Sequence, residues 1–246
     1  MNGVKKAMLV AMVCAGSITA RAADPAQAQR ALELTRQMVA AIDGVKQYQV
    51  MFSKEQRIDG EMSPVETILL RHRREPECRY LRWVENPHKG RELLYCPSKY
   101  EGKVKVHEGG LFGMITLTLA TDSDRIRKGN LRPIEDSGIY FMSERAKADL
   151  KDPSLMANDP GLKIDTETVH GQPSICVYNT RIAPGKDPYT LGAHRICIDN
   201  STHLPTKATV WNARNQKMEE YIYWDYKVNP DWGEEVFDVD NGEYGF

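Results

Sequence analysis

The sequence lacks the motifs by which enzymes are usually recognised. It has no Gly-x-Ser-x-Gly turn for a nucleophilic serine, no His-Glu-x-x-His pair for zinc and no Walker loop for phosphates. Acidic residues near its end would be suited to general acid and base work, but a solvated tail explains them better. These residues are Glu234, Glu235, Asp238 and Asp240. We therefore expect no catalytic residue, no cofactor and no enzymatic activity.

Metal ligands are equally sparse. The chain has six histidines, none of them four residues from another, and no Cys-x-x-Cys. Three histidines converging in space would be the alternative, but separate surface or strand histidines account for them better. The six are His72, His88, His107, His170, His194 and His203. The sequence thus predicts no metal site.

The charge balance disfavours a nucleic-acid partner. The formal net charge is −1, from 33 basic and 34 acidic residues. The main basic cluster, Arg71-His72-Arg73-Arg74, is interpreted as a solvated strand end, with a site for phosphate or lipid headgroups as the alternative. No nucleic-acid partner is expected.

The longest apolar run lies at the N-terminus. Lys5 and Lys6 precede the run from Ala7 to Ile18, and Ala20-Arg21-Ala22 has small residues at the spacing that signal peptidase prefers. The run is shorter than the roughly 20 residues that a membrane span needs, and no later segment is longer. Residues 1–23 are therefore predicted to be a secretory signal peptide.

Cleavage would leave residues 24–246 as a single domain in the periplasm, with no membrane segment. Cys14 raises the alternative of a lipidated protein. Val13, however, occupies a position where lipoprotein signals carry Gly or Ala, so a soluble exported protein is favoured.

Residues 45–100 read as four consecutive strands of one antiparallel sheet. Tyr48, Val50 and Phe52 alternate with polar neighbours, as in a half-buried strand. Asp59-Gly60 is suited to a two-residue hairpin turn. Such a turn pairs Val50 with Leu69 and Phe52 with Thr67.

The second hairpin turns at Asn86–Gly90, and one register satisfies several favourable cross-strand pairs at once. The pairs are Arg82 with Glu92, Tyr80 with Leu94, Leu81 with Leu93, Trp83 beside Arg91, and Cys78 with Cys96. This register predicts a disulfide between Cys78 and Cys96, because directly opposed strand residues lie within the span of a disulfide.

A similar register applies to residues 174–180 and 193–199. It sets Cys176 opposite Cys197 and Val177 opposite Ile196, which predicts a second disulfide. The alternative, a metal site at these cysteines, is disfavoured because no histidine lies at ligand spacing.

Helical patterns flank and interrupt the strands. Residues 25–42 form an amphipathic pattern, and a short helix near 123–128 and a longer one over 138–150 interrupt the strands. A curved sheet offers such helices its concave face. The last strand, 217–228, is expected to place Tyr221 and Tyr223 on one face and Ile222, Trp224 and Tyr226 on the other.

Several of these patterns together resemble a known family. They are Tyr48 to Gly60, Glu66 to Pro76, Tyr80-Leu81-Arg82-Trp83, Leu94-Tyr95-Cys96, Asp122-Ser123 before Gly138-Ile139, and Val236-Phe237-Asp238. The chain looks like a family of uncharacterised exported bacterial proteins, itself similar to the periplasmic lipoprotein carrier (LolA-like) and lipoprotein-sorting-factor superfamily. The likeness covers roughly residues 31–240. The carrier lacks this arrangement of four cysteines, and its lipoprotein-handling residues have no one-to-one match here.

That resemblance implies a mainly β fold, a strongly curved antiparallel half-barrel. An N-terminal helix and a helical insertion would cover its concave face. It also implies an apolar cavity for a lipid, an acyl chain or another hydrophobic ligand, and no catalytic residues. The segment from Gly109 to Ile115 is interpreted as an ordinary loop whose apolar side chains fill the core, with a flexible lip of a binding cavity as the alternative. The expected ligand-binding residues are Phe52, Leu111, Phe112, Met114, Tyr140, Phe141 and Met142.

Two functions of different class follow. The first is a periplasmic, non-catalytic binding protein for a hydrophobic ligand, with a role in envelope or outer-membrane biogenesis. The second is a protein-protein interaction module whose interior is filled by its own helices and whose partner is an envelope protein.

Overall fold

The computed structural model describes residues 22–110, 115–180 and 191–246, so most of the predicted signal peptide lies outside the described residues. The strands are β1 (Gln47–Ile58), β2 (Glu61–Met62), β3 (Glu66–Arg73), β4 (Cys78–Trp83), β5 (Glu92–Tyr95), β6 (Lys103–His107), β7 (Thr116–Ala120), β8 (Lys163–Val169), β9 (Gln172–Asn179), β10 (Leu191–Asp199), β11 (Pro205–Asn212) and β12 (Lys217–Val228). The helices are α1 (Pro25–Asp43), α2 (Asp124–Arg127), α3 (Ile139–Leu150) and α4 (Ser154–Ala157), with short 3-10 turns η2 (Ile134–Asp136) and η3 (Glu234–Phe237).

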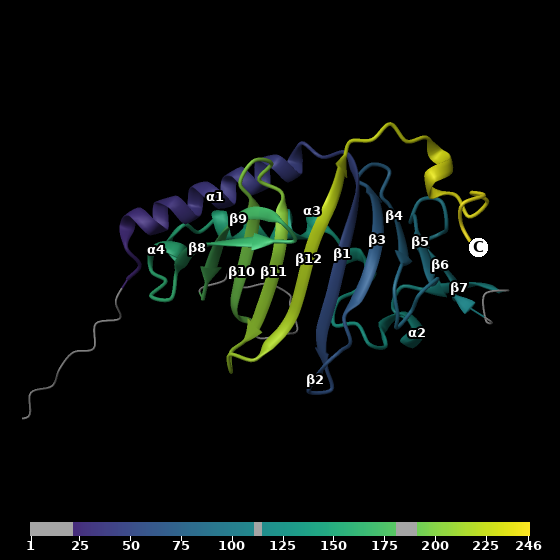
Figure 1. The fold of residues 1–246 in the computed structure, drawn as a ribbon, viewed down its shortest axis with the longest axis horizontal. Helices are drawn as coiled ribbons and strands as arrows, with labels where there is room; N and C mark the ends of the chain where they lie inside the picture. The colour runs from purple at the N-terminus through teal and green to yellow at the C-terminus, as the bar shows by residue number, and fades with distance from the viewer. Residues whose placement is uncertain (1–21, 111–114, 181–190) are drawn as a thin grey trace, which may run out of the picture.

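All the strands belong to one antiparallel sheet in the order β7-β6-β5-β4-β3-β1-β12-β11-β10-β9-β8, with β2 paired to β1 alone. The two longest strands, β1 and β12, lie side by side at its centre and join the two halves of the chain. Figure 1 shows α1 crossing the upper ends of the strands and α3 lying behind the sheet. The predicted mainly β fold, an antiparallel sheet with an N-terminal helix and a helical insertion, is confirmed.

Alternation along β1 defines the concave face of the sheet. Tyr48, Val50 and Phe52 are buried there, and the next inward positions are held by Lys54 and Gln56. Helix α1 begins at the N-cap Asp24, whose carboxylate accepts hydrogen bonds from the first backbone N–H groups. Its apolar stripe, together with that of α3, packs into the same core.

The first hairpin departs from the predicted register by one residue. The turn at Asp59-Gly60 does form, and it pairs Ile58 with Glu61 as a two-residue turn requires. After β2, however, the backbone N–H of Ser63 donates to Gln56, and the following Pro64 has no N–H to continue the ladder. One extra residue is therefore accommodated before β3.

As a result, Val50 lies opposite Leu70 and Phe52 opposite Ile68, rather than opposite Leu69 and Thr67. The corrected register brings Ile68 and Leu70 onto the concave face, so that an isoleucine stands where the predicted pairing has Thr67. Both are buried. The core is thus more apolar than the predicted pairing implies.

The other two registers match the predictions. In the second hairpin Arg82 pairs with Glu92 and Leu81 with Leu93, and Cys78 is bonded to Cys96. In the C-terminal half, Cys197 pairs directly with Cys176, to which it is bonded. Both predicted disulfides are therefore present.

The last strand differs from the prediction at one residue. Tyr221 and Tyr223 share one face as expected, and both line the cavity. Tyr226, however, returns to the same concave side, where its ring centroid lies 6.3 Å from that of Tyr48. The reason is a bulge at Asp225, whose φ of 55° interrupts the alternation where the β1–β12 register shifts.

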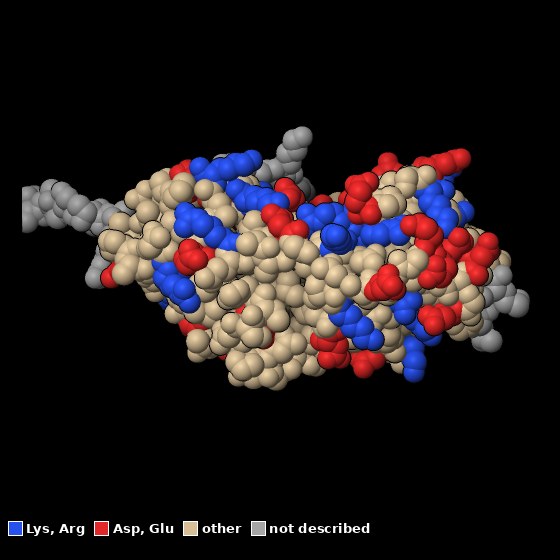
Figure 2. Space-filling model, turned by 90° about the horizontal axis from the view of Figure 1, so that it is seen from above, with Lys and Arg blue, Asp and Glu red and all other residues tan. Residues whose placement is uncertain are grey.

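The basic cluster at the end of β3 is not a solvated strand end. His72 is 1% exposed and Arg73 7% exposed. Arg73 binds Glu234 at 2.7 Å, and the Arg74 guanidinium lies over the ring of Tyr140. Figure 2 shows acidic and basic side chains intermixed along the upper edge of the molecule. The cluster is neutralised within the protein.

The C-terminal segment is likewise not a solvated tail. Val236 and Phe237 are buried on the convex side against the Cys78–Cys96 disulfide. Lys99 holds Asp238 at 2.6 Å, and Tyr244 stacks on Tyr80 at 3.9 Å between ring centroids. The segment is held in place because Val236 and Phe237 are buried, and two of its acidic residues, Glu234 and Asp238, form ion pairs.

Within the described part of the chain, no helix has the length and apolar character that crossing a bilayer requires.

Candidate functional site

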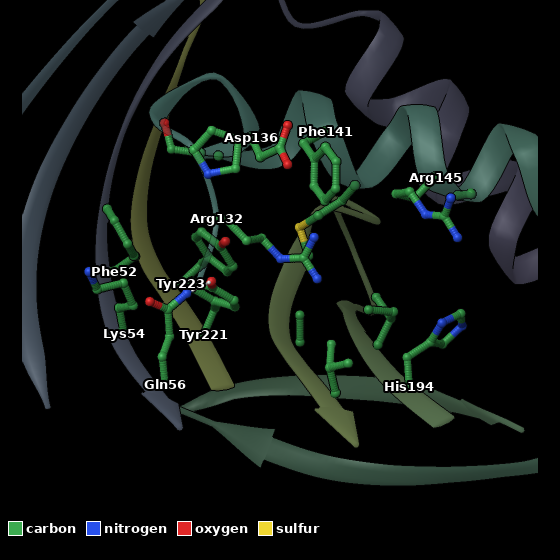
Figure 3. A pocket seen from close by; sticks show the side chains of 18 of the residues that line it. Phe52, Lys54, Gln56, Arg132, Asp136, Phe141, Arg145, His194, Tyr221 and Tyr223 are labelled. Atoms are coloured by element: carbon green, nitrogen blue, oxygen red, sulfur yellow. Dashed lines mark hydrogen bonds between the residues drawn. The ribbon is translucent and has the colours of Figure 1, made fainter. Parts of the chain in front are cut away.

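A cavity of about 200 Å³ lies between the concave face of the sheet and the helices. Its floor comes from β1, β3, β4, β5 and β9 to β12, and its roof from α1, α2, α3, α4 and residues 130–138. Figure 3 shows α3 above the strands with side chains from both layers pointing between them. The cavity is smaller than the roughly 300–1,000 Å³ of pockets for drug-sized ligands.

Most of the lining is aliphatic or aromatic. These residues are Leu34, Met38, Phe52, Ile68, Leu81, Trp83, Leu93, Ile126, Pro133, Ile134, Phe141, Met142, Ala146, Met156, Val177, Ile196, Ile198, Ala208, Val210, Tyr221 and Tyr223. Phe52 stacks on Tyr223 at 5.7 Å between ring centroids, which forms an aromatic floor across β1 and β12. Such a surface favours contact with apolar groups.

A first polar group is set into this apolar wall at Lys54. Its ammonium donates to Asn130 at 2.7 Å and lies 3.4 Å from Glu66. The indole N–H of Trp83 donates to the other oxygen of Glu66 at 2.5 Å. Burial lowers the pKa of the Lys54 ammonium, and the charge of Glu66 opposes that shift.

A second polar group joins the helical insertion to β12. Arg132 binds Glu219 through two hydrogen bonds of 2.7 and 2.6 Å, a bidentate geometry. The hydroxyl of Tyr221 donates to Glu219 at 2.7 Å and accepts from Gln56 at 2.6 Å. The amide oxygen of Gln56 accepts from the backbone N–H of Leu131 at 3.2 Å, so residues 130–132 are held against β1 and β12.

Arg145 and His194 both line another part of the cavity. Figure 3 shows Arg145 reaching down from α3 and His194 standing on β10 beneath it. Burial lowers the pKa of the His194 imidazole, while the carboxylate of Asp149 opposes the shift. The surface that His194 exposes faces the cavity, since this residue lines it.

The predicted ligand-binding residues fall into three groups. Phe52, Phe141 and Met142 line the cavity together. Tyr140 does not: it turns to the other side of α3, where its hydroxyl donates to the backbone oxygen of Val45 at 3.2 Å. Leu111, Phe112 and Met114 lie outside the described residues.

The polar lining is missed by reasoning from the sequence, although part of it carries a signal. Lys54 and Gln56 continue the same alternation that places Phe52 inward, so the pattern points them to the concave face. Arg132, Arg145 and His194 carry no such signal, because their place depends on how the insertion crosses the sheet.

Among the described residues, one group of potential metal ligands gathers, consisting of Glu167, Cys176 and Cys197. Its two sulfur atoms are joined in a disulfide, so neither is available as a thiolate ligand. The chemistry of this donor set does not suit a metal ion.

Several solved structures match this chain at low sequence identity. The Pseudomonas aeruginosa MucA/MucB complex matches with 17% identity and a TM-score of 0.45, over 85% of this chain and 61% of that one. This chain thus spans about three fifths of that relative's length. The Mycobacterium tuberculosis lipoprotein LppX matches with 16% identity and a TM-score of 0.49, over 85% and 98% of the two chains.

A LolA superfamily protein from Nitrosomonas europaea matches with 11% identity and a TM-score of 0.39, over 85% and 97% of the two chains. All three TM-scores lie below 0.5. Among curated proteins, no match to the sequence is found.

One family model covers most of the chain, from residue 45 to residue 246, and its description is "Protein of unknown function (DUF1571)". The matched region contains every strand of the sheet and almost all of the cavity lining. The chain belongs to the DUF1571 family.

Proposed function

We propose that this protein is a non-catalytic binding protein, exported to the periplasm, that holds a hydrophobic ligand such as a lipid or an acyl chain. The observation that supports the proposal is the cavity of about 200 Å³ with its predominantly apolar lining. Each methylene buried there would contribute about 0.8 kcal/mol. Affinity for an acyl chain then needs no charged anchor.

The size of the cavity bears on the ligand. Because it is small, it accommodates one short chain or part of a longer one, and Met38, Met142 and Met156 in its roof are the side chains best able to adapt. All three come from the helices α1, α3 and α4, so a longer ligand is accommodated by movement of the roof rather than of the sheet.

The test is binding of an apolar fluorescent dye, N-phenyl-1-naphthylamine, combined with native mass spectrometry of the purified protein. We expect dye fluorescence to rise on binding and to be reversed by an aliphatic alcohol. A protein that carries no copurified apolar molecule and takes up no dye contradicts the proposal.

A second function, as a protein-protein interaction module, is supported by one edge of the sheet. Strand β7 contains no charged residue or proline, and the adjacent Ile115 is 65% exposed. Uncharged edge strands are suited to accept a further strand from an extended partner. Replacing Thr118 with Pro would remove a ladder N–H. Loss of an envelope partner in crosslinking, with dye binding unchanged, would favour this function over the first.

A further inference from the structure

The charged side chains of the cavity are matched within the protein. The lining contains three cationic residues, Lys54, Arg132 and Arg145, and two acidic ones, Asp136 and Asp149. Two further carboxylates, Glu66 and Glu219, stand directly behind the first two cations. Cations and anions are therefore nearly balanced.

The pairing is close and sheltered. The side chains of Lys54 and Glu66 are 11% and 10% exposed, and those of Arg132 and Glu219 are 14% and 1% exposed. Arg145, Asp136 and Asp149 also have interactions within the protein. A buried pair of this kind loses stability when one partner is drawn away, because the other charge is left uncompensated.

The neutral polar groups beside these pairs are also engaged. Asn130 accepts from Lys54 and donates to the backbone oxygen of Ile126 at 3.0 Å. Gln56 donates to Tyr221 and accepts from Leu131. A charged ligand group entering here would compete with hydrogen bonds that already exist.

We infer that the cavity selects uncharged apolar ligands, such as an aliphatic alcohol or the chain of an ester, and discriminates against ionised amphiphiles of either sign. This inference rests on the proposed function and specifies its ligand class. An ionised carboxylate or ammonium would have to give up its hydration without finding an unengaged counter-charge among the described lining residues. A hydroxyl or ester loses far less hydration. His194 adds no positive charge near pH 7, because burial lowers the pKa of its imidazole and keeps it neutral.

The test uses three probes of equal chain length, namely 1-decanol, decanoate and decylammonium, each displacing N-phenyl-1-naphthylamine at pH 7.5. We expect 1-decanol to bind at least about tenfold more tightly than either ion, which corresponds to about 1.4 kcal/mol. Decanoate binding as tightly as 1-decanol, or more tightly, would overturn the inference while leaving the proposed function intact.

A matched pair of variants on β12 tests whether the preference for an uncharged ligand arises from the charge pairing beside the cavity. Glu219→Gln removes the counter-charge that stands behind the cavity-lining Arg132, so the preference for 1-decanol over decanoate is expected to narrow severalfold. Glu220→Gln alters the next residue, which faces outward and pairs with Lys207 and Lys217 at 3.5 Å, and is expected to leave the preference unchanged. An equal effect of both variants would contradict the inference.

Glu219 is fully buried, so its replacement also perturbs the folded protein. A second variant therefore tests the same change in ligand preference. Glu66→Gln removes the counter-charge of Lys54 and is expected to favour decanoate in the same way. If the wild-type protein binds neither the dye nor any probe, the proposed function fails and this inference fails with it.

Discussion

Tyr48 and His72 meet on the concave face, where the tyrosine hydroxyl lies 3.2 Å from Nδ1 of the imidazole. Arg79 donates to Nε2 of the same ring at 3.0 Å, so Nδ1 carries the proton and donates to Tyr48. The same hydroxyl accepts from the backbone N–H of Ile139 at 3.0 Å. This contact fixes the first turn of α3, and hence the roof of the cavity, to the centre of the sheet.

Replacing Tyr48 with Phe tests that contact. The variant leaves the N–H of Ile139 and Nδ1 of His72 without an acceptor in a fully buried site, which is expected to cost about 1–3 kcal/mol of the free energy of unfolding. Urea denaturation measures it. Tyr178→Phe is the control, since that side chain lies on the convex face beside Trp211. Equal stability of the two variants would contradict the role of Tyr48.

Gly138 permits the close approach of α3. Its φ is 89°, and a Cβ there would lie 2.3 Å from the Tyr48 hydroxyl and 3.0 Å from Nδ1 of His72. Gly138→Ala is expected to destabilise the protein by more than the roughly 1 kcal/mol due to backbone strain alone. Gly60→Ala is the matched control, because Gly60 has a φ of 90° and a Cβ added there would have no atom within 4 Å. Thermal and urea unfolding of both variants measure the difference. The control reports the backbone strain that both variants share, and the excess at Gly138 reports the steric clash of the added Cβ.

Stability should depend on pH through His72. Burial, followed by the charges of Arg79 and Arg74, lowers the pKa of this imidazole well below its usual value of 6.5. Between the two pKa values the unfolded chain binds one more proton than the folded protein. The contribution of His72 to the free energy of unfolding is therefore fully present above pH 6.5. It is lost as the pH falls below 6.5, by up to about 1.4 kcal/mol per pH unit.

His194, whose pKa is also lowered by burial, contributes in the same direction. Urea midpoints between pH 7.5 and 5 give the slope. The variant His72→Gln is expected to be less stable at pH 7.5 but to lose stability less steeply on acidification. If the urea midpoint of this variant fell with pH as steeply as that of the wild type, His72 would be excluded as a source of the pH dependence.

The two disulfides each close a short segment of chain. The bonded cysteines are 18 residues apart for Cys78–Cys96 and 21 apart for Cys176–Cys197. Chain entropy predicts that removing either bridge by paired Cys→Ala replacement costs about 3 kcal/mol. Unfolding with and without a reductant measures the effect, and a peptide map of the unreduced protein checks the pairing. A bridge between Cys78 and Cys176 would contradict the structure.

Filling the cavity should abolish ligand binding without unfolding the protein. Ala146 on α3 lines the cavity, so Ala146→Phe is expected to reduce dye affinity at least about tenfold, with a stability change within about 1–3 kcal/mol. Ala148→Phe adds the same side chain on the same helix outside the cavity lining. Similar dye affinity in both variants would place the dye elsewhere.

Much of the sheet follows from local sequence. The pairing of Arg82 with Glu92, and of Cys176 with Cys197, could be predicted because the turn and several cross-strand contacts favour one register. The predicted register of the first hairpin was wrong by one residue, because β2 and Pro64 lie between its two long strands. Tyr226 was placed on the wrong face because a bulge at Asp225 leaves no clear pattern in the sequence.

The amino-acid sequence by itself determined the strands, the amphipathic helix and the two disulfides, because alternation, turn residues and cross-strand pairs act over short distances along the chain. Only the tertiary structure decided the cavity and its charge balance. The contacts that set them join residues far apart in sequence: Lys54 and Asn130 are separated by 76 positions, Arg132 and Glu219 by 87, and Gln56 and Tyr221 by 165. No local preference selects such partners. They are brought together when burial of the apolar faces curves the sheet beneath its helices.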